Sequence, residues 1–301
     1  VPATPTITND TFTVTASQAQ GSLAFSNPPT TAAAGERKVV SYYRSITSDA
    51  ARINLVGSTS AVKFYESTSS TAVITTLDVA VGGASQTTPG TFCVEANAPG
   101  SYTYRITATG LSAAESNLTV SSGSFASVTI SGLQTSYKVG DDSIVGSLLF
   151  KDAQGNLTTA GLPSTATLSV VTGAAAFRAF ADTSFSASPL TLQVGGASEV
   201  KFGLKLPLSG SSVTIQAGAG TNTALASIAL TSNPDIRIAV VNTVDLKANQ
   251  TSEVVLQLYN NNTAISTVGD LTINLGTSTE YGTWKSAAGS EITQLTIPAG
   301  G

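Results

Sequence analysis

The stretch from Ala166 to Gly220 contains three short strand-like runs that are bounded by glycine: TLSVVTG (167–173), LTLQVGG (190–196) and GSSVTIQAGAG (210–220). Their hydroxyl-bearing, β-branched and other apolar residues are typical of β-strands with one buried face. Glycine at the ends of the runs permits the backbone conformations that tight turns require. The stretch therefore predicts consecutive β-strands joined by turns.

The same arrangement occurs again on either side of this stretch. The corresponding runs are RINLVG (52–57), LDVAVGG (77–83), GSYTYRITATG (100–110), LTINLG (271–276) and QLTIPAGG (294–301). In all three copies the first glycine and the next glycine pair lie about 22 to 25 residues apart, and the copies recur about every 103 to 116 residues. This period is longer than that of solenoid repeats and fits one small all-β domain per copy.

We therefore expect an all-β chain of three tandem Greek-key β-sandwiches, at residues 1–122, 123–231 and 232–301. The third sandwich is expected to be incomplete, because the other two have further strands beyond the position that corresponds to Gly301. Two explanations stay open. Either the chain is a fragment of a longer protein, or another chain donates the missing strand to an unpaired sheet edge.

Local patterns indicate several individual elements. TFTVT at 11–15 alternates as an edge strand does, residues 27–35 are rich in proline and alanine and indicate a loop, and KVVSYYRSI at 38–46 favours a strand. The run at 144–150 (IVGSLLF) leads into a turn in which Gly155 is expected to have a positive φ.

Composition restricts the kind of partner. Charged residues make up 11% of the chain, against about 25% in ordinary globular proteins, and the net charge is −4. Such weakly charged surfaces can pack against copies of themselves. The chain is not basic enough to indicate nucleic acid, and it has no apolar run of roughly 20 residues that would span a membrane. It starts Val1-Pro2 without a basic and apolar leader, so we expect a mature or trimmed product.

The absence of histidine excludes Ser-His-Asp and Cys-His catalysis as well as histidine-ligated metal sites. The acids are spread thinly, and the repeat does not place a matching pair of carboxylates in each copy, as a glycosidase would need. We therefore expect no enzyme, no catalytic residues and no cofactor-binding residues.

Calcium is the one cofactor left open. Asp141 and Asp142 precede a strand and Asp235 follows a linker, so these three are weak candidate ligands for a hard cation between domains. The acidic loop typical of calcium sites is absent, and turn formation explains these residues better. Asp152 is expected to be a turn residue.

The paired tyrosines and the single cysteine each have a structural and a functional interpretation. Tyr42-Tyr43 and the pair Tyr102 and Tyr104 would place aromatics on one sheet, where a sugar or partner could bind, but their spacing favours core packing. Cys93 lies on an alternating strand and is expected to be a small buried side chain, with an intermolecular thiol as the alternative.

LLFKDAQGNLTTAG (148–161), LTIPAGG (295–301) and the glycine-bounded period together resemble the bacterial immunoglobulin-like modules of invasin- and intimin-like adhesins and of surface-layer (S-layer) subunits. The resemblance covers the whole chain at the level of architecture and implies immunoglobulin-like sandwiches in an exported, extracellular protein of the bacterial cell surface. The acidic, hydroxyl-rich composition is more similar to S-layer subunits than to adhesin tips. A wall-anchoring segment typical of such subunits is not visible in this sequence.

The expected function is thus that of a structural S-layer subunit whose tandem modules self-assemble, with copies of itself as partners. Cell-surface polysaccharide would bind through regions outside this sequence. An adhesin stalk or a ligand-binding module is the alternative, and an accessory region of a carbohydrate-active enzyme is a remote one.

Overall fold

The structure is a computed structural model that describes residues 20–242, 250–277 and 283–300. All regular elements among these residues are β-strands, as the sequence predicts. The chain divides into two compact units, Val1–Gly123 and Ser124–Gly301. The division lies close to the first expected domain boundary. The second boundary, between residues 231 and 232, falls inside the second unit and stays a prediction.

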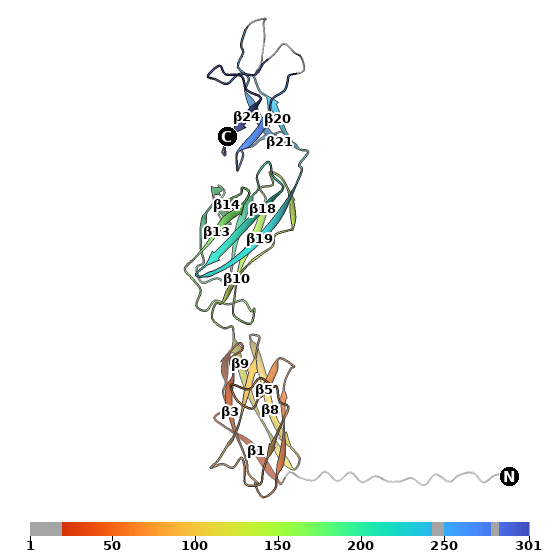
Figure 1. Cartoon of the computed structure of the whole chain (residues 1–301). Helices are drawn as coiled ribbons and strands as arrows, with labels where there is room; N and C mark the ends of the chain where they lie inside the picture. The colour runs from red at the N-terminus through yellow and green to blue at the C-terminus, as the bar shows by residue number, and fades with distance from the viewer. Residues whose placement is uncertain (1–19, 243–249, 278–282, 301) are drawn as a thin grey trace, which may run out of the picture. The chain divides into compact units, whose positions relative to one another are not determined.

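The first unit is a β-sandwich (Figure 1). Its strands are β1 (Gly21–Ser26), β2 (Thr31–Ala33), β3 (Lys38–Arg44), β4 (Ala51–Gly57), β5 (Val62–Tyr65), β6 (Thr76–Val79), β7 (Gly90–Ala96), β8 (Gly100–Ala108) and β9 (Leu111–Ser121). The pairing order is β5-β7-β3-β1-β9-β8-β4-β6, with β2 beside β9. Strand β1 joins the two layers, because Gly21 and Ser22 pair with β9 whereas Leu23–Ser26 pairs with β3.

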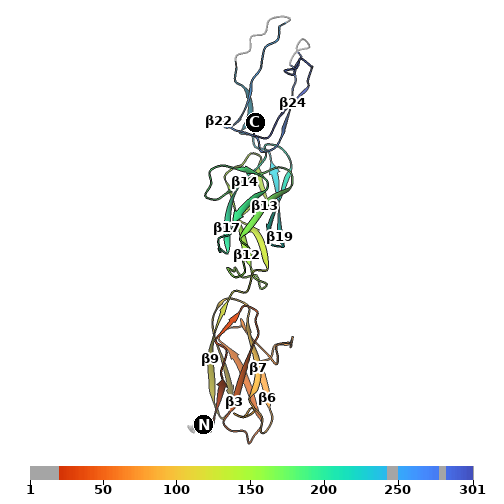
Figure 2. The same cartoon turned by 90° about the vertical axis from the view of Figure 1, so that its left-hand side faces the viewer.

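The second unit begins with a sandwich of two five-stranded sheets. Its strands are β10 (Ser127–Ser131), β11 (Ser136–Lys138), β12 (Ile144–Lys151), β13 (Thr165–Thr172), β14 (Ala176–Ala179), β15 (Ser186–Ala187), β16 (Leu190–Gln193), β17 (Glu199–Lys205), β18 (Ser212–Ala219) and β19 (Asn222–Thr231). The sheet orders are β10-β12-β17-β14-β15 and β11-β19-β18-β13-β16. Figure 2 labels β12, β14 and β17 of one sheet and β13 and β19 of the other. Both sandwiches have the immunoglobulin-like architecture.

Two small sheets follow in the same unit. They contain β20 (Ile236–Val240), β21 (Leu256–Asn260) and β22 (Thr263–Ala264) in one sheet, and β23 (Leu271–Asn274) and β24 (Gln294–Ile297) in the other. Strands β20 and β21 pair as β10 and β12 do, in antiparallel register over five residue pairs. The described residues thus repeat the opening of the preceding sandwich.

Each sandwich encloses its own apolar core. Alternation along β12 shows why, since Ile144, Leu148 and Phe150 are buried on one side while Val145 is exposed on the other. One core contains apolar residues from Leu23 to Val120, and the other contains apolar residues from Val128 to Ile228. Burial of these side chains is the main stabilising contribution to each sandwich.

Several local expectations are confirmed, and others are wrong. Gly155 has a φ of 86° in the turn after β12, and residues 38–44 form a strand. The segment 27–35, expected to be a loop, contains the short strand β2, while β1, β11, β14 and β15 were not expected at all. These strands are short or rich in small residues, so their pattern is weak and their partners decide their conformation. The expected strand at 11–15 lies outside the described residues.

Candidate functional site

Asp141 and Asp142 lie in the turn between β11 and β12. The Asp141 carboxylate accepts a hydrogen bond of 3.1 Å from the backbone N–H of Lys138, and the carbonyl of Asp141 accepts one of 2.8 Å from the N–H of Leu206. Asp142 is exposed. Asp141 therefore stabilises the turn through its side chain and its backbone carbonyl.

Asp235, the third candidate ligand, is exposed just before β20. Its N–H donates to Oδ1 of Asn233 at 3.1 Å, and the Asn233 side chain donates to the carbonyl of Val139 at 3.2 Å. The turns that carry Asp141 and Asp235 are thus hydrogen-bonded neighbours. Within the described part of the chain, however, no three acids, cysteines or histidines group as metal ligands do, so the calcium site stays a prediction.

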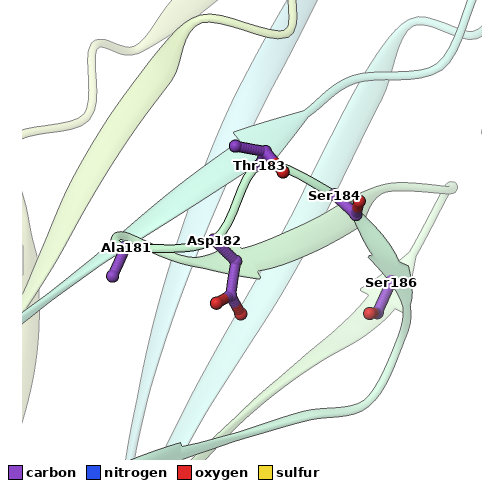
Figure 3. A pocket seen from close by; sticks show the side chains of 5 residues that line it. All are labelled: Ala181, Asp182, Thr183, Ser184 and Ser186. Carbon is purple, nitrogen blue, oxygen red and sulfur yellow. The ribbon is translucent and has the colours of Figure 1, made fainter.

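A shallow hollow lies in the connection between β14 and β15 (Figure 3). It is lined by Ala181, Asp182, Thr183, Ser184 and Ser186. Asp182 is the one charged residue of this lining. Hydrolysis of a glycosidic bond by the usual route needs two carboxyl groups that flank the bond, and the lining of this hollow supplies one.

A second open hollow lies at the edge formed by β4 and β6, lined by residues 50–52 and 78–80. Arg52 Nε and Asp78 Oδ1 are 3.1 Å apart there, and both side chains are largely exposed. An exposed ion pair of this kind contributes little to stability. Its single carboxylate is engaged by the guanidinium.

The outer face of the sheet around β17 holds a cluster that the sequence analysis missed. The Arg178 guanidinium lies 5.3 Å from the ring centre of Phe185, and the Lys201 ammonium lies 5.7 Å from that of Phe180. Half of Phe180 is exposed, and the face of an aromatic ring attracts cations. The run FRAF at 177–180 was the available signal, because alternation places Arg178 and Phe180 opposite the buried Phe177.

The candidate tyrosines lie in two different layers. Tyr42 is on β3 and Tyr104 is on β8, and both are buried in the first core. Tyr102 packs partly against that core, and Tyr43 is half-buried. Strands β3 and β8 both belong to the same nine-stranded hydrogen-bonded order, in which β1 and β9 lie between them. The interpretation as core residues is confirmed for Tyr42 and Tyr104.

Cys93 is buried on β7, as expected for a small apolar side chain. Burial raises the pKa of the Cys93 thiol, and the nearby Arg37 opposes this shift. The Arg37 guanidinium covers the Tyr65 ring at 3.7 Å and forms an ion pair of 2.7 Å with Glu95, which raises the pKa of Arg37. A buried thiol with a raised pKa is poorly reactive, which argues against an intermolecular disulfide.

The C-terminal sheets bury far fewer apolar side chains than either sandwich does. Ile238 pairs directly with Leu258 and Val240 with Leu256, so these four apolar side chains lie on one face of the β20–β21 pair. Leu258 is buried, whereas Ile238 is 43% exposed and Val240 is 53% exposed. We call these four residues the open face.

The open face has no counterpart in the two sandwich cores. Leu258 is the one fully buried apolar residue among those described from 236 to 300, and the apolar residues of β23 and β24 are half-buried. Val241, directly after β20, and Val255, directly before β21, are also exposed. Contiguous exposed apolar residues of this kind mark a surface that another segment or molecule covers. The open face is therefore the candidate interaction site.

No protein-family model and no curated protein matches this chain. Solved structures resemble it at low identity. They include domains 4 and 5 of the S-layer protein SbsC (13% identity, 46% of this chain and 69% of that one, TM-score 0.26) and the Yersinia pseudotuberculosis adhesin InvE (11%, 70% and 58%, 0.27). A family 2 glycosyl hydrolase from Bacteroides cellulosilyticus is similar at 13% identity, with 66% of this chain covered and a TM-score of 0.31.

The chain spans 23% of the length of that hydrolase. Scores of this size assign no activity, ligand or partner to the present chain. Among the described residues no helix is long and apolar enough to cross a membrane.

Proposed function

We propose that this chain is a structural subunit of an exported bacterial surface layer, and that it works by self-assembly of consecutive β-sandwiches. The observation that carries the proposal is the open face, which follows two sandwiches that each close their own core. Sandwiches with closed cores need no ligand to fold. The apolar surface that remains is then available for contact with other molecules of the same kind.

The composition of the outer surfaces supports the same proposal. Exposed apolar residues also occur on outward faces of both sandwiches, and they include Val39, Val56, Val171 and Leu225. With 11% charged residues and a net charge of −4, repulsion between copies is weak. A contact between two different patches on identical chains generates an extended assembly when its rotation does not close into a ring.

Two parts of the proposal concern ligands. Calcium would bind between the hydrogen-bonded turns that carry Asp141, Asp142 and Asp235, where it would stiffen the junction before β20. Cell-surface polysaccharide would be held by regions outside this sequence.

Electron microscopy of the purified chain, with Ca²⁺ and with a chelator, tests the proposal. We expect periodic sheets or strands of particles that grow with protein concentration. The variant Leu225→Ser removes an exposed apolar side chain that is 64% accessible on β19, and it should reduce lateral order without unfolding the chain. Monomeric protein at every concentration, with and without Ca²⁺, would contradict a surface-layer subunit.

An adhesin stalk or ligand-binding module is the second candidate function. The exposed ring of Phe180, with the Lys201 ammonium beside it, favours a surface that binds a ligand over a stalk that binds none. A chain that stays monomeric, yet loses binding to a host glycan or matrix protein upon Phe180→Ser, would support it. An accessory region of a carbohydrate-active enzyme would instead bind that enzyme's polysaccharide.

A further inference from the structure

The outer face of the sheet that contains β14 and β17 carries three cations close together. Alternation along the two strands places Arg178, Lys201 and Lys205 on the side away from the core. Arg178 pairs with Gly203 across the strands, so each lysine is its diagonal neighbour, with Cα atoms about 7–8 Å apart. We call these three residues the cationic surface.

The glycine between the two lysines allows this arrangement. A Cβ atom at Gly203 would lie 2.7 Å from both Cγ and Nε of Arg178. The Arg178 side chain therefore lies directly over the backbone of Gly203, in space that any other residue would fill. Its charge is thus held over the middle of β17, between those of Lys201 and Lys205.

No carboxylate neutralises the cationic surface. Arg178 donates hydrogen bonds to the carbonyl oxygens of Phe180, at 3.2 Å, and of Asp182. In the described part of the chain none of the three cations forms an ion pair. Glu199, at the start of β17, accepts a hydrogen bond of 2.7 Å from the hydroxyl of Ser147 instead. A row of cations without carboxylate partners attracts a ligand with several anionic groups.

An exposed aromatic ring and a polar hollow adjoin the cationic surface. Phe180 is 51% exposed, and the Lys201 ammonium lies 5.7 Å from its ring centre. The connection that follows Phe180 lines the hollow of Figure 3 with four oxygen-bearing side chains, those of Asp182, Thr183, Ser184 and Ser186. An apolar ring beside several polar groups suits a sugar, because the C–H face of a sugar packs on the ring while its hydroxyls bond to the oxygens.

We propose that this surface binds an acidic polysaccharide, with the carboxylates of its sugars on Arg178, Lys201 and Lys205 and one sugar ring on Phe180. A polymer of uronic acids carries a carboxylate on each sugar, so it engages several cations along β17 at once. An acidic peptide would match the cations but would leave the ring and the hollow unused.

The inference goes beyond the proposed surface layer, because binding at this surface does not require assembly. It names a ligand class for the Phe180 surface of the second candidate function. It also adds a polysaccharide contact within the described residues to the one expected of regions outside this sequence.

The first arm of the test compares two ligands on the dilute full-length chain by titration calorimetry. One is an oligogalacturonate, and the matched control is its methyl ester, which has the same sugars without the charges. We expect the ester to bind roughly tenfold more weakly, because it forms no charge-assisted hydrogen bonds. Added salt should weaken binding of the acid and leave that of the ester unchanged.

The second arm compares variants of the chain. Lys201→Gln with Lys205→Gln removes two charges and should weaken oligogalacturonate binding roughly tenfold. The matched control is Lys138→Gln, exposed on β11 of the opposite sheet, which should bind as the wild type does. Phe180→Leu keeps an apolar side chain but removes the ring, and it should weaken binding of both oligomers roughly fivefold. These side chains lie outside the core, so the thermal transitions should not change.

Equal binding of the acid and its ester, or of the wild type and the double lysine variant, would overturn the proposal. Polyglutamate that binds as tightly as oligogalacturonate and is insensitive to Phe180→Leu would also overturn it, because the ligand would then be an acidic protein segment. The surface-layer function fails separately. A chain that binds oligogalacturonate but never forms sheets keeps the binding surface and loses the surface layer, and a chain that forms sheets without binding does the reverse.

Discussion

At the scale of single residues, Arg44 shows how a charge can belong to a core. It ends β3 on the same side as the buried Val40 and Tyr42 and is itself buried. Its guanidinium donates to the carbonyls of Gly83 at 2.9 Å and Ala80 at 2.6 Å and to that of Asp49. The arginine thus donates charged hydrogen bonds to backbone carbonyls of two loops.

We expect Arg44→Met to lower the free energy of unfolding by roughly 2–4 kcal/mol, because three backbone carbonyls lose the charged donor that the buried Arg44 supplies. Urea denaturation of the full chain measures the change. The matched control is Arg52→Met, since Arg52 is exposed in its ion pair with Asp78, and it should leave the midpoint nearly unchanged. Equal effects of the two substitutions would contradict the structural role of Arg44.

Burial of a tyrosine hydroxyl predicts a dependence on pH. The pKa of Tyr42 is raised from its ordinary value of 10.0, mainly by burial, against a smaller opposing effect of Arg44. The unfolded chain releases this proton first as the pH rises. The contribution of Tyr42 to stability is therefore fully present below about pH 10 and is lost as the pH rises through the higher folded pKa.

Tyr42→Phe should make the first unit less sensitive to alkali, so its urea midpoint falls less between pH 9 and pH 11 than that of the wild type. Tyr43→Phe is the matched control, because it removes a hydroxyl from the opposite side of β3. Parallel curves for the wild type and Tyr42→Phe would show that Tyr42 is not the responsible group. Tyr104, whose pKa is also raised by burial, continues to contribute in both proteins.

At the scale of elements, β12 shows why glycine interrupts an apolar run. A Cβ atom at Gly146 would lie 2.5 Å from Cζ of Phe202 on β17, so the ring occupies the space of the missing side chain. The pairing of Gly146 with Phe202 places them side by side. The position of this glycine therefore depends on a partner strand more than 50 residues away in the chain.

We expect Gly146→Ala to destabilise the second unit by about 1–3 kcal/mol through overpacking. Thermal unfolding of the full chain measures the shift. Ser147→Ala, one residue along and on the outer side of the strand, is the matched control. Phe202→Leu should recover part of the loss in the double variant, and an unchanged transition for Gly146→Ala alone would contradict the packing described.

The turn after β12 is an element that the sequence did predict. Gly155 has the expected positive φ, and Oδ1 of Asp152 accepts hydrogen bonds of 3.0 Å and 2.9 Å from the N–H groups of Gln154 and Asn156. All of these residues lie within five positions of each other, so local chemistry suffices. The strands β14 and β15 were missed because they are four and two residues long, too short for alternation to separate them from loops.

At the scale of the whole molecule, the two compact units each contain a core built from their own residues. We therefore expect two calorimetric transitions. Leu55→Ala, in the first core, and Leu168→Ala, in the second, should each cost about 2–5 kcal/mol and lower a different transition. A single transition that both substitutions lower equally would contradict the division into units.

The strand-rich class, the repeat period and the exclusion of histidine-based chemistry follow from the amino-acid sequence alone. Alternation and turn residues act between near neighbours in the chain, so such features can be recognised without a structure. The tertiary structure decided what depends on distant partners: the carbonyls around Arg44, the separation of Tyr42 from Tyr104, and the cluster at Phe180. It also showed that Ile238 and Val240 are exposed, because coverage of an apolar strand depends on which other strand packs against it.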